Sequence, residues 1–308
     1  QFPLEVDIYD AGKYVRKEVW VDAKAKNEFR FKVSPKYSLI NIDPRGLIVG
    51  DEAAYKTPEQ YLFQYQNAKD YKSRNQAVEY AITTSNNEIL ISALKDPFFR
   101  LRIKAIQGLR PDNVAQWAPV VENLAQNDPE NLTKAAAIAQ LSRLRDAKYK
   151  SLYEKSVKLP SRAVKIAAAS ALVALDPSQA GQYIDMIDLK GLSFEQFMSF
   201  YPYILKNRNE KYLPVLLDKV IYYPLYPEQY QTPIKEGFTW LMSVDNTEYT
   251  KKVTKSLSNV FGWLNEEQKK HLHAVAEEGL KIKEDLLKKN PNSQSIKAQV
   301  ELLKNIKW

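Results

Sequence analysis

A spaced repeat in the middle of the chain limits its possible folds more than any other feature. A basic residue is followed three positions later by alanine, and seven or eight positions later by an aliphatic residue. The basic residues are 28, 32 and 31 positions apart, and they are Arg74, Arg102, Lys134 and Lys165. A helix pair of this length cannot bury its own apolar face, so neighbouring pairs must stack. We therefore expect a mainly α chain built as an α-α superhelix.

The helical pattern extends over residues 55–308, where apolar residues recur at spacings of three and four. We expect about ten to twelve helices. Four start signals place a capping residue before proline, at Thr57-Pro58, Asp96-Pro97, Asp128-Pro129 and Asp176-Pro177. The repeat resembles the second helix of HEAT repeats, although its units are shorter. Past about residue 190 the repeat is lost and aromatic residues dominate, which is typical of a capping segment.

Residues 1–54 have instead the alternating pattern of β-strands. Strands are expected at residues 2–9, 15–21, 29–33 and 40–42, with a further short one at 47–49, and turns at 10–13 and 43–46. These segments predict a small antiparallel β-sandwich domain, or part of one, ahead of the HEAT-like solenoid. The strands are too few to close a good sandwich alone. Either they pack on the helices or their partner strands lie before residue 1.

Composition excludes several classes of site. The chain has 308 residues, no cysteine, nine glycines and a formal net charge of +8. Without cysteine there is no disulfide framework, cysteine–zinc site or thiol nucleophile. No apolar run approaches the roughly 20 residues that cross a bilayer. The 45 basic residues are spread among 37 acidic ones, so we expect no nucleic-acid partner, although a nucleic-acid-binding HEAT protein remains a weaker alternative.

The order of these parts resembles a known family. Residues 2–10, Val19-Trp20-Val21, residues 29–33 and Ile42-Asp43-Pro44 are similar to the β-sandwich domain of M1 metallopeptidases. In that family, this domain joins the zinc-binding catalytic domain to a C-terminal domain of stacked helix pairs. The resemblance implies that this chain is the non-catalytic C-terminal portion of an M1 zinc aminopeptidase. It would pack on the catalytic domain, which is absent from this sequence, and shape the access of peptides.

The catalytic motifs of the family are missing from this sequence. Neither His-Glu-x-x-His nor a Gly-x-Met-Glu-Asn type loop occurs, so the resemblance implies no catalytic, cofactor or metal residue here. Zinc is expected only in the absent domain, and the compartment, periplasm or cytoplasm, stays open. The chain opens in a strand pattern without methionine, so we expect it to be part of a longer protein. The alternative is a protein-interaction scaffold from a catalytically inactive M1-like protein.

Candidate chemistry within the chain is sparse. His271 and His273 lie two positions apart on an expected helix, so they point in different directions and do not share a metal easily. We interpret them as solvated. The acid pairs at 266–267 and 277–278 are likewise interpreted as polar helix faces.

Basic residues give the one candidate contact site. Arg100, Arg102, Arg143 and Arg145 are predicted to contact peptides or carboxylates, in a stripe with Lys104, Arg110, Arg162 and Lys165. The other interpretation, which we favour, is ion pairing between repeats, with Asp96, Asp112, Asp128, Asp146 and Asp176 as partners. The aromatic residues at 222–240 have two interpretations. They could line a peptide groove, or, as we favour, they belong to the core.

Overall fold

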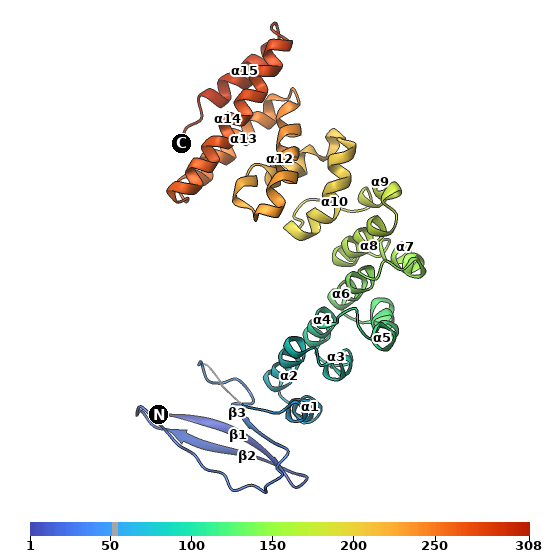
Figure 1. Cartoon of the computed structure of the whole chain (residues 1–308), viewed down its shortest axis with the longest axis vertical. Helices are drawn as coiled ribbons and strands as arrows, with labels where there is room; N and C mark the ends of the chain where they lie inside the picture. The colour runs from blue at the N-terminus through green and yellow to red at the C-terminus, as the bar shows by residue number, and fades with distance from the viewer. Residues whose placement is uncertain (51–54) are drawn as a thin grey trace. The chain divides into compact units, whose positions relative to one another are not determined.

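The computed structural model describes residues 1–50 and 55–308. These residues are mainly helical, at 63%, with 15 α-helices and a three-stranded antiparallel sheet at the N-terminus (Figure 1). They divide into two compact units, unit 1 at Gln1–Leu175 and unit 2 at Asp176–Trp308. The expected domain boundary after residue 54 lies at residues 51–54, outside the described part. No helix in the described part is long and apolar enough to cross a membrane.

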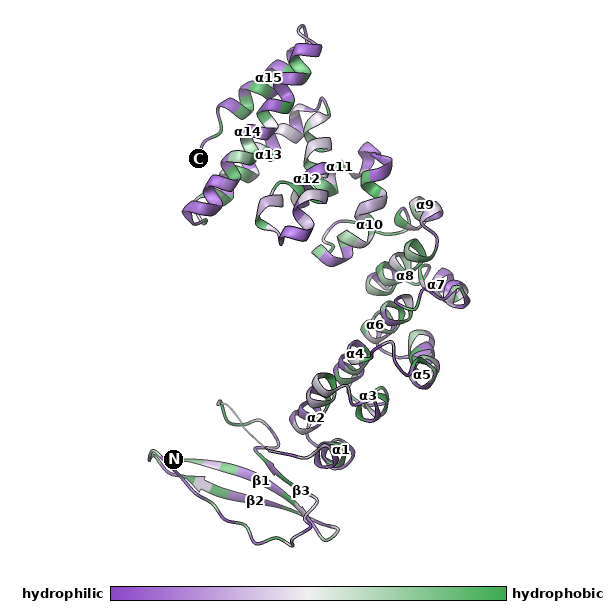
Figure 2. Ribbon diagram, viewed as in Figure 1, coloured by the Kyte–Doolittle hydropathy of each residue, from purple (hydrophilic) through white to green (hydrophobic). Residues whose placement is uncertain are grey.

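The sheet of unit 1 has the strand order β2-β1-β3. Its strands are β1 (Phe2–Asp10), β2 (Lys13–Val21) and β3 (Leu39–Ile42), as the alternating pattern predicts. The turn between β1 and β2 uses Ala11 and Gly12, both with positive φ. The hydropathy colours alternate along β1 and β2 (Figure 2), which is the pattern of strands whose two faces differ.

Register assigns the two faces of this sheet. Val6 pairs with Lys17 and Ile42, and Ile8 with Val15 and Ile40, so one face is largely apolar. The other face carries Asp7, Arg16 and Asn41. It is this polar face that is bound to the helices. Asn41 Nδ2 donates to Ser73 Oγ at 2.7 Å, and the Tyr9 ring meets the Phe63 ring at 5.5 Å.

Two expected strands are wrong. Residues 29–33 form no strand; instead, Phe31 lies beneath Lys17 Nζ at 5.8 Å, and Ser34 N donates to the Asp10 carboxylate at 2.9 Å. Residues 47–49 form none either, because Leu47 N donates to the Asp43 carboxylate at 2.8 Å. At residues 47–49 the Asp43 side chain therefore accepts hydrogen bonds that alternation alone assigned to a strand ladder.

The helices of unit 1 alternate between two layers. Four helices contact one another in series: α2 (Tyr71–Thr84), α4 (Phe99–Gly108), α6 (Asn131–Ser142) and α8 (Arg162–Leu175). The other four each pack against at least one of these: α1 (Pro58–Asn67), α3 (Asn87–Ala93), α5 (Val114–Asn127) and α7 (Lys150–Ser156). The short 3₁₀ turn Ala147–Tyr149 precedes α7. Figure 1 shows this order from blue to green.

The repeat falls on the first layer. Its alanines are fully buried, one in each of α2, α4, α6 and α8, and they are Ala77, Ala105, Ala137 and Ala168. A small side chain at these positions lets neighbouring helices approach closely. Gly108 shows how tight the packing is, since a Cβ there would meet Ile82 Cγ1 at 2.6 Å.

The start signals are only partly right. Thr57 caps α1 in a full capping box with Gln60. Asp96 and Asp128 stand two residues before the caps of α4 and α6, where their carboxylates accept from Phe98 N and Glu130 N, each at 2.8 Å. Asp176 precedes the short 3₁₀ turn Pro177–Gln179 rather than a long helix.

Unit 2 holds the remaining helices, which are α9 (Ala180–Ile184), α10 (Phe194–Asn207), α11 (Leu213–Val220), α12 (Glu228–Ser243), α13 (Thr247–Phe261), α14 (Glu266–Lys289) and α15 (Gln294–Lys304). Two further 3₁₀ turns lie at Glu210–Tyr212 and Tyr223–Leu225. The expected ten to twelve helices were too few, because short helices such as α3 and α9 carry little periodic signal. Aromatic side chains fill the core, among them Phe197, Tyr201 and Phe238.

Candidate functional site

Arg102 is bound inside unit 1. Its Nε and Nη2 donate to the two oxygens of Asp128 at 2.7 and 2.8 Å, and its Nη1 donates to the Asp96 carbonyl at 2.8 Å. The side chains of Arg102 and Asp128 are 10% and 2% exposed. Arginine matches a carboxylate in this two-point geometry. Of the two interpretations of Arg102, ion pairing between repeats is the one that the geometry favours.

A similar arrangement occurs one repeat earlier, in α2. Arg74 Nε donates to Asp96 at 2.8 Å, and Tyr65 OH donates to the same carboxylate at 3.1 Å. Burial and the nearby Asp96 charge raise the pKa of Tyr65. Asp112 and Asp146 do not extend this series, because Asn87 Nδ2 reaches Asp112 at 3.4 Å and Lys148 Nζ pairs locally with Asp146 at 3.1 Å.

The predicted arginine stripe is divided between opposite helix ends. Arg102, in the first turn of α4, reaches Asp128 just before α6, and Gln140 near the end of α6 donates to the Leu109 carbonyl at 3.0 Å. The two helices therefore run parallel. Arg143 and Arg145 follow the C-terminal end of α6, at the other end from Arg100 and Arg102. Since a ten-residue helix is about 15 Å long, the four arginines do not form one site.

Arg100 does line a cavity. The cavity has a volume of about 330 Å³ and is lined by Lys69, Tyr71, Arg74, Phe98 and Arg100. All five stand at the beginnings of α2 and α4. The rings of Tyr71 and Phe98 meet edge to face at 5.0 Å and remain 47% and 38% exposed. We call this the basic aromatic pocket.

The charge of this pocket is positive. Asp96 neutralises Arg74, whose Nη1 also donates to the Lys69 carbonyl at 2.5 Å. Lys69 and Arg100 have no ion pair with any described residue, and the Arg100 guanidinium lies 5.8 Å from the centre of the Phe99 ring. Two free cations beside two exposed rings can hold a carboxylate together with an apolar side chain.

A second cavity adjoins the basic aromatic pocket through Lys69. It has a volume of about 350 Å³ and lies against the sheet, with Tyr9, Lys13, Tyr14 and Phe63 in its lining. Burial, and next the charge of Asp7, raises the pKa of Tyr9 to about 12. The hydrogen bonds that Arg16 makes to Asp7 and Asp70 raise its own pKa and tie the sheet to the start of α2.

The interpretations for unit 2 have mixed outcomes. Of the aromatic residues at 222–240, three are buried in the core as favoured, namely Tyr223, Phe238 and Trp240. The others are only partly buried, namely Tyr222, Tyr226 and Tyr230. Glu278 is not a solvated acid, because it accepts from Tyr223 OH at 2.7 Å and pairs with Lys235 Nζ at 3.0 Å. His271 is exposed as expected.

His273 differs from the prediction of a solvated histidine. It is half-buried between the rings of Phe261 and Trp308, at centroid distances of 5.1 and 4.1 Å. In the described residues no three histidine, aspartate or glutamate side chains are grouped so as to hold a metal ion.

No family model matches the chain, and no curated protein matches it. The basic aromatic pocket was only partly visible in the sequence. Arg100 is one of the candidate residues predicted from the sequence, whereas Tyr71 and Phe98 are not among them. The available signal was their position directly after Asp70 and Pro97, where first-turn side chains at neighbouring helix starts converge.

Proposed function

We propose that this chain is the non-catalytic C-terminal portion of an M1-family zinc aminopeptidase. In this proposal it packs on the catalytic domain, closes one side of the cleft and limits which peptides enter. Zinc and its ligands belong to the catalytic domain, so the chain alone neither holds the metal nor cleaves peptides.

The order of parts supports the proposal. A small antiparallel sheet is followed by helices that alternate between two layers, with a buried alanine repeated on one layer. The fold that fits this order best is a HEAT-like solenoid, in which each helix pair contacts only its neighbours. The Arg74–Asp96 and Arg102–Asp128 pairs are the kind of link between repeats that such a stack uses.

The observation that carries the proposal is the uncovered part of the sheet. On its apolar face Val6 and Ile8 are buried, but Phe2, Val15 and Ile42 remain 43%, 49% and 41% exposed. The polar face is bound to the helices instead. A three-stranded sheet with exposed apolar residues is half of a sandwich, and a second sheet would complete it.

Within the proposed function, the basic aromatic pocket is the site that would contact the peptide. In some M1 enzymes a basic residue of the helical domain reaches the active-site cleft and holds a substrate carboxylate. In the basic aromatic pocket, Lys69 and Arg100 have no ion pair with any described residue, so their charges can make such a contact. We propose that they hold the carboxylate of a peptide, with Tyr71 and Phe98 against its last side chain.

An activity assay tests the proposal. The purified chain is incubated with alanine and leucine p-nitroanilides, with and without added zinc. We expect no hydrolysis in either case and no retention of zinc after dialysis. Hydrolysis that a chelator abolishes would contradict the proposal, because the metal ligands would then have to come from these 308 residues.

A protein-interaction scaffold is the second candidate. The exposed rings of Tyr71 and Phe98 favour it, because aromatic residues beside arginine are typical of binding surfaces. The discriminating feature is the coding sequence before Gln1. His-Glu-x-x-His there indicates an aminopeptidase, whereas an M1-like domain without that motif indicates a scaffold.

A further inference from the structure

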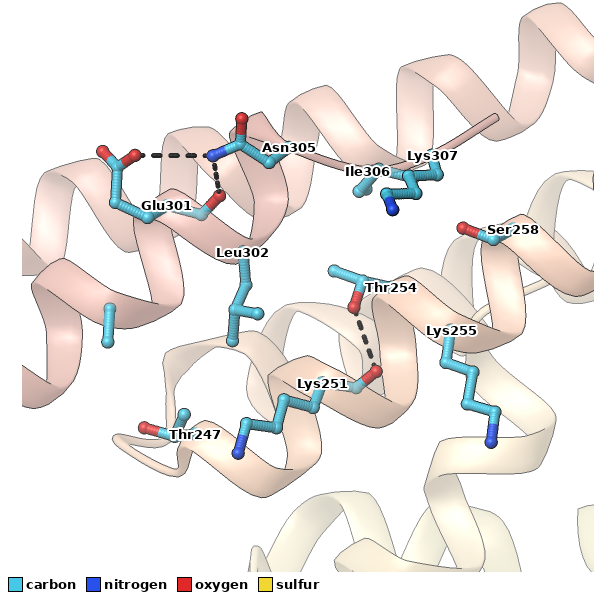
Figure 3. Close-up of a pocket in the computed structure, with 11 residues that line it drawn as sticks. Thr247, Lys251, Thr254, Lys255, Ser258, Glu301, Leu302, Asn305, Ile306 and Lys307 are labelled. Atoms are coloured by element: carbon cyan, nitrogen blue, oxygen red, sulfur yellow. Dashed lines mark hydrogen bonds between the residues drawn. The ribbon is translucent and has the colours of Figure 1, made fainter.

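A groove in unit 2 has no role in the proposed function. It lies between α13 and α15 and continues along the residues after α15, with a volume of about 780 Å³ (Figure 3). α13 and α15 pack against each other, so the groove is formed within one unit. Two sets of residues define its character, an apolar row and a group of lysines.

The apolar row begins on one side of α15 and continues into the residues after the helix, where Ile306 lies. Ala298, Leu302 and Ile306 are spaced by four residues and all line the groove. Leu302 extends from α15 toward α13 (Figure 3). The core of unit 2 is contacted by a different side of this helix, through Ile296, Val300 and Leu303. This second apolar row is only partly covered by the fold, since Ala298 is exposed and Leu302 and Ile306 are partly exposed.

Lysines surround this row. α13 and residues 294–308 together hold six lysines and two glutamates. Lys255 and Lys307 are exposed, line the groove and have no ion pair or hydrogen bond with any described residue. Lys251 Nζ forms an ion pair with Glu248 at 2.9 Å. Both side chains are more than half exposed, so this pair contributes little to stability.

We propose that this groove binds an acidic amphipathic helix of a partner protein. Apolar residues of the partner at a spacing of four would lie on Ala298, Leu302 and Ile306, and its carboxylates would meet Lys255 and Lys307. This is the helix-in-groove mode of recognition, in which apolar anchors supply affinity and charges supply orientation. A nucleic acid would leave the apolar row unused, and a flat bilayer does not fit a row recessed between two helices.

Binding of designed peptides to the full chain tests this proposal. The probe is a fluorescein-labelled 18-residue peptide with leucine at every fourth position and glutamate and alanine elsewhere. One comparison peptide has lysine in place of glutamate, and another has serine in place of leucine. Fluorescence anisotropy should show binding of the acidic leucine peptide, at least tenfold weaker binding of both others, and weakening with added salt.

Charge-reversal variants locate the binding site. Lys255→Glu combined with Lys307→Glu should weaken binding at least tenfold, whereas Lys297→Glu, an exposed lysine of α15 outside the groove, should change it less than twofold. Ile306→Ser should also weaken binding, which tests the apolar row without a change of charge. Circular dichroism checks that each variant is folded.

Four results would overturn the proposal. They are no binding of the acidic peptide, equal binding of the lysine peptide, equal effects of Lys297→Glu and the double reversal, and lysine-dependent binding of phosphatidylserine vesicles without binding of the peptide. The proposal does not depend on the aminopeptidase assignment, since the hydrolysis assay and the peptide assay can fail independently.

Discussion

At the scale of single residues, two neighbouring arginines differ in whether their charge is already bound within the fold. Arg100 and Arg102 are two positions apart in α4, yet one guanidinium is exposed and the other is enclosed by Asp128 and the Asp96 carbonyl. From the sequence alone the two residues look equivalent, because they have the same charge and lie in the same expected helix. The structure assigns them different roles, because their side chains leave the helix on different sides.

The Arg102–Asp128 pair should be essential for stability. Arg102→Ala leaves a carboxylate buried without its partner, so we expect a loss of about 3–5 kcal/mol in the free energy of unfolding. Arg100→Ala is the matched control, and its effect should stay within about 0.5 kcal/mol. Urea denaturation followed by circular dichroism measures both. Similar effects of the two variants would contradict the assignment of Arg102 to the interior.

Lys283 should make stability depend on pH. Its side chain is buried in unit 2 and donates to the Val244 carbonyl at 2.7 Å, and burial lowers its pKa from 10.5 to about 8. Because the unfolded chain then binds more protons between pH 8 and pH 10.5, stability should rise with pH in that window. The expected gain from pH 8 to pH 10 is about 2 kcal/mol.

The comparison variant for this effect is Lys283→Met. It has no amine to titrate, so its stability should rise by about 2 kcal/mol less than that of the unaltered chain over the same pH range. Urea denaturation at pH 8, 9 and 10 measures the difference. Parallel curves for the two proteins would show that the lysine is already charged and solvated in the fold.

At the scale of helices, the repeat makes a direct prediction about packing. Ala137 is buried in α6, whereas Ala139 of the same helix is exposed. Ala137→Leu inserts three carbons between packed helices and should cost about 1–3 kcal/mol. Ala139→Leu adds the same atoms on the solvent side and should cost far less. Thermal unfolding of the two variants measures the difference, and equal midpoints would contradict close approach at the repeated alanine.

Helices and strands also show what could be predicted from sequence. Three strands, the turn at 10–13 and the helices that carry the repeat were predicted because periodicity records burial on one face. The strand expected at 29–33 was wrong because alternation does not reveal whether a neighbouring strand is present. The sequence predicts helix starts at Asp96 and Asp128, and in the structure each carboxylate also binds an arginine of the preceding repeat. The sequence indicates that Asp96 and Asp128 could pair with basic residues of other repeats, but it does not show which arginine each one binds, because that depends on how the helices stack.

For the whole molecule, the exposed sheet face is the feature that the proposed function explains. Val15→Lys together with Ile42→Lys should lower the binding of an apolar dye and raise solubility, with a small effect on the unfolding midpoint. Glu18→Lys adds positive charge on the opposite face and is the control. A large loss of stability in the double variant would mean that this face is already covered within the chain.

The central claim is that these residues accompany a zinc peptidase domain that they do not themselves contain. The most direct measurement is the nucleotide sequence of the gene upstream of the codon for Gln1. We expect an M1-type domain there with His-Glu-x-x-His and a later glutamate as zinc ligands. An upstream region that lacks this motif, or a start codon immediately before Gln1, would contradict it.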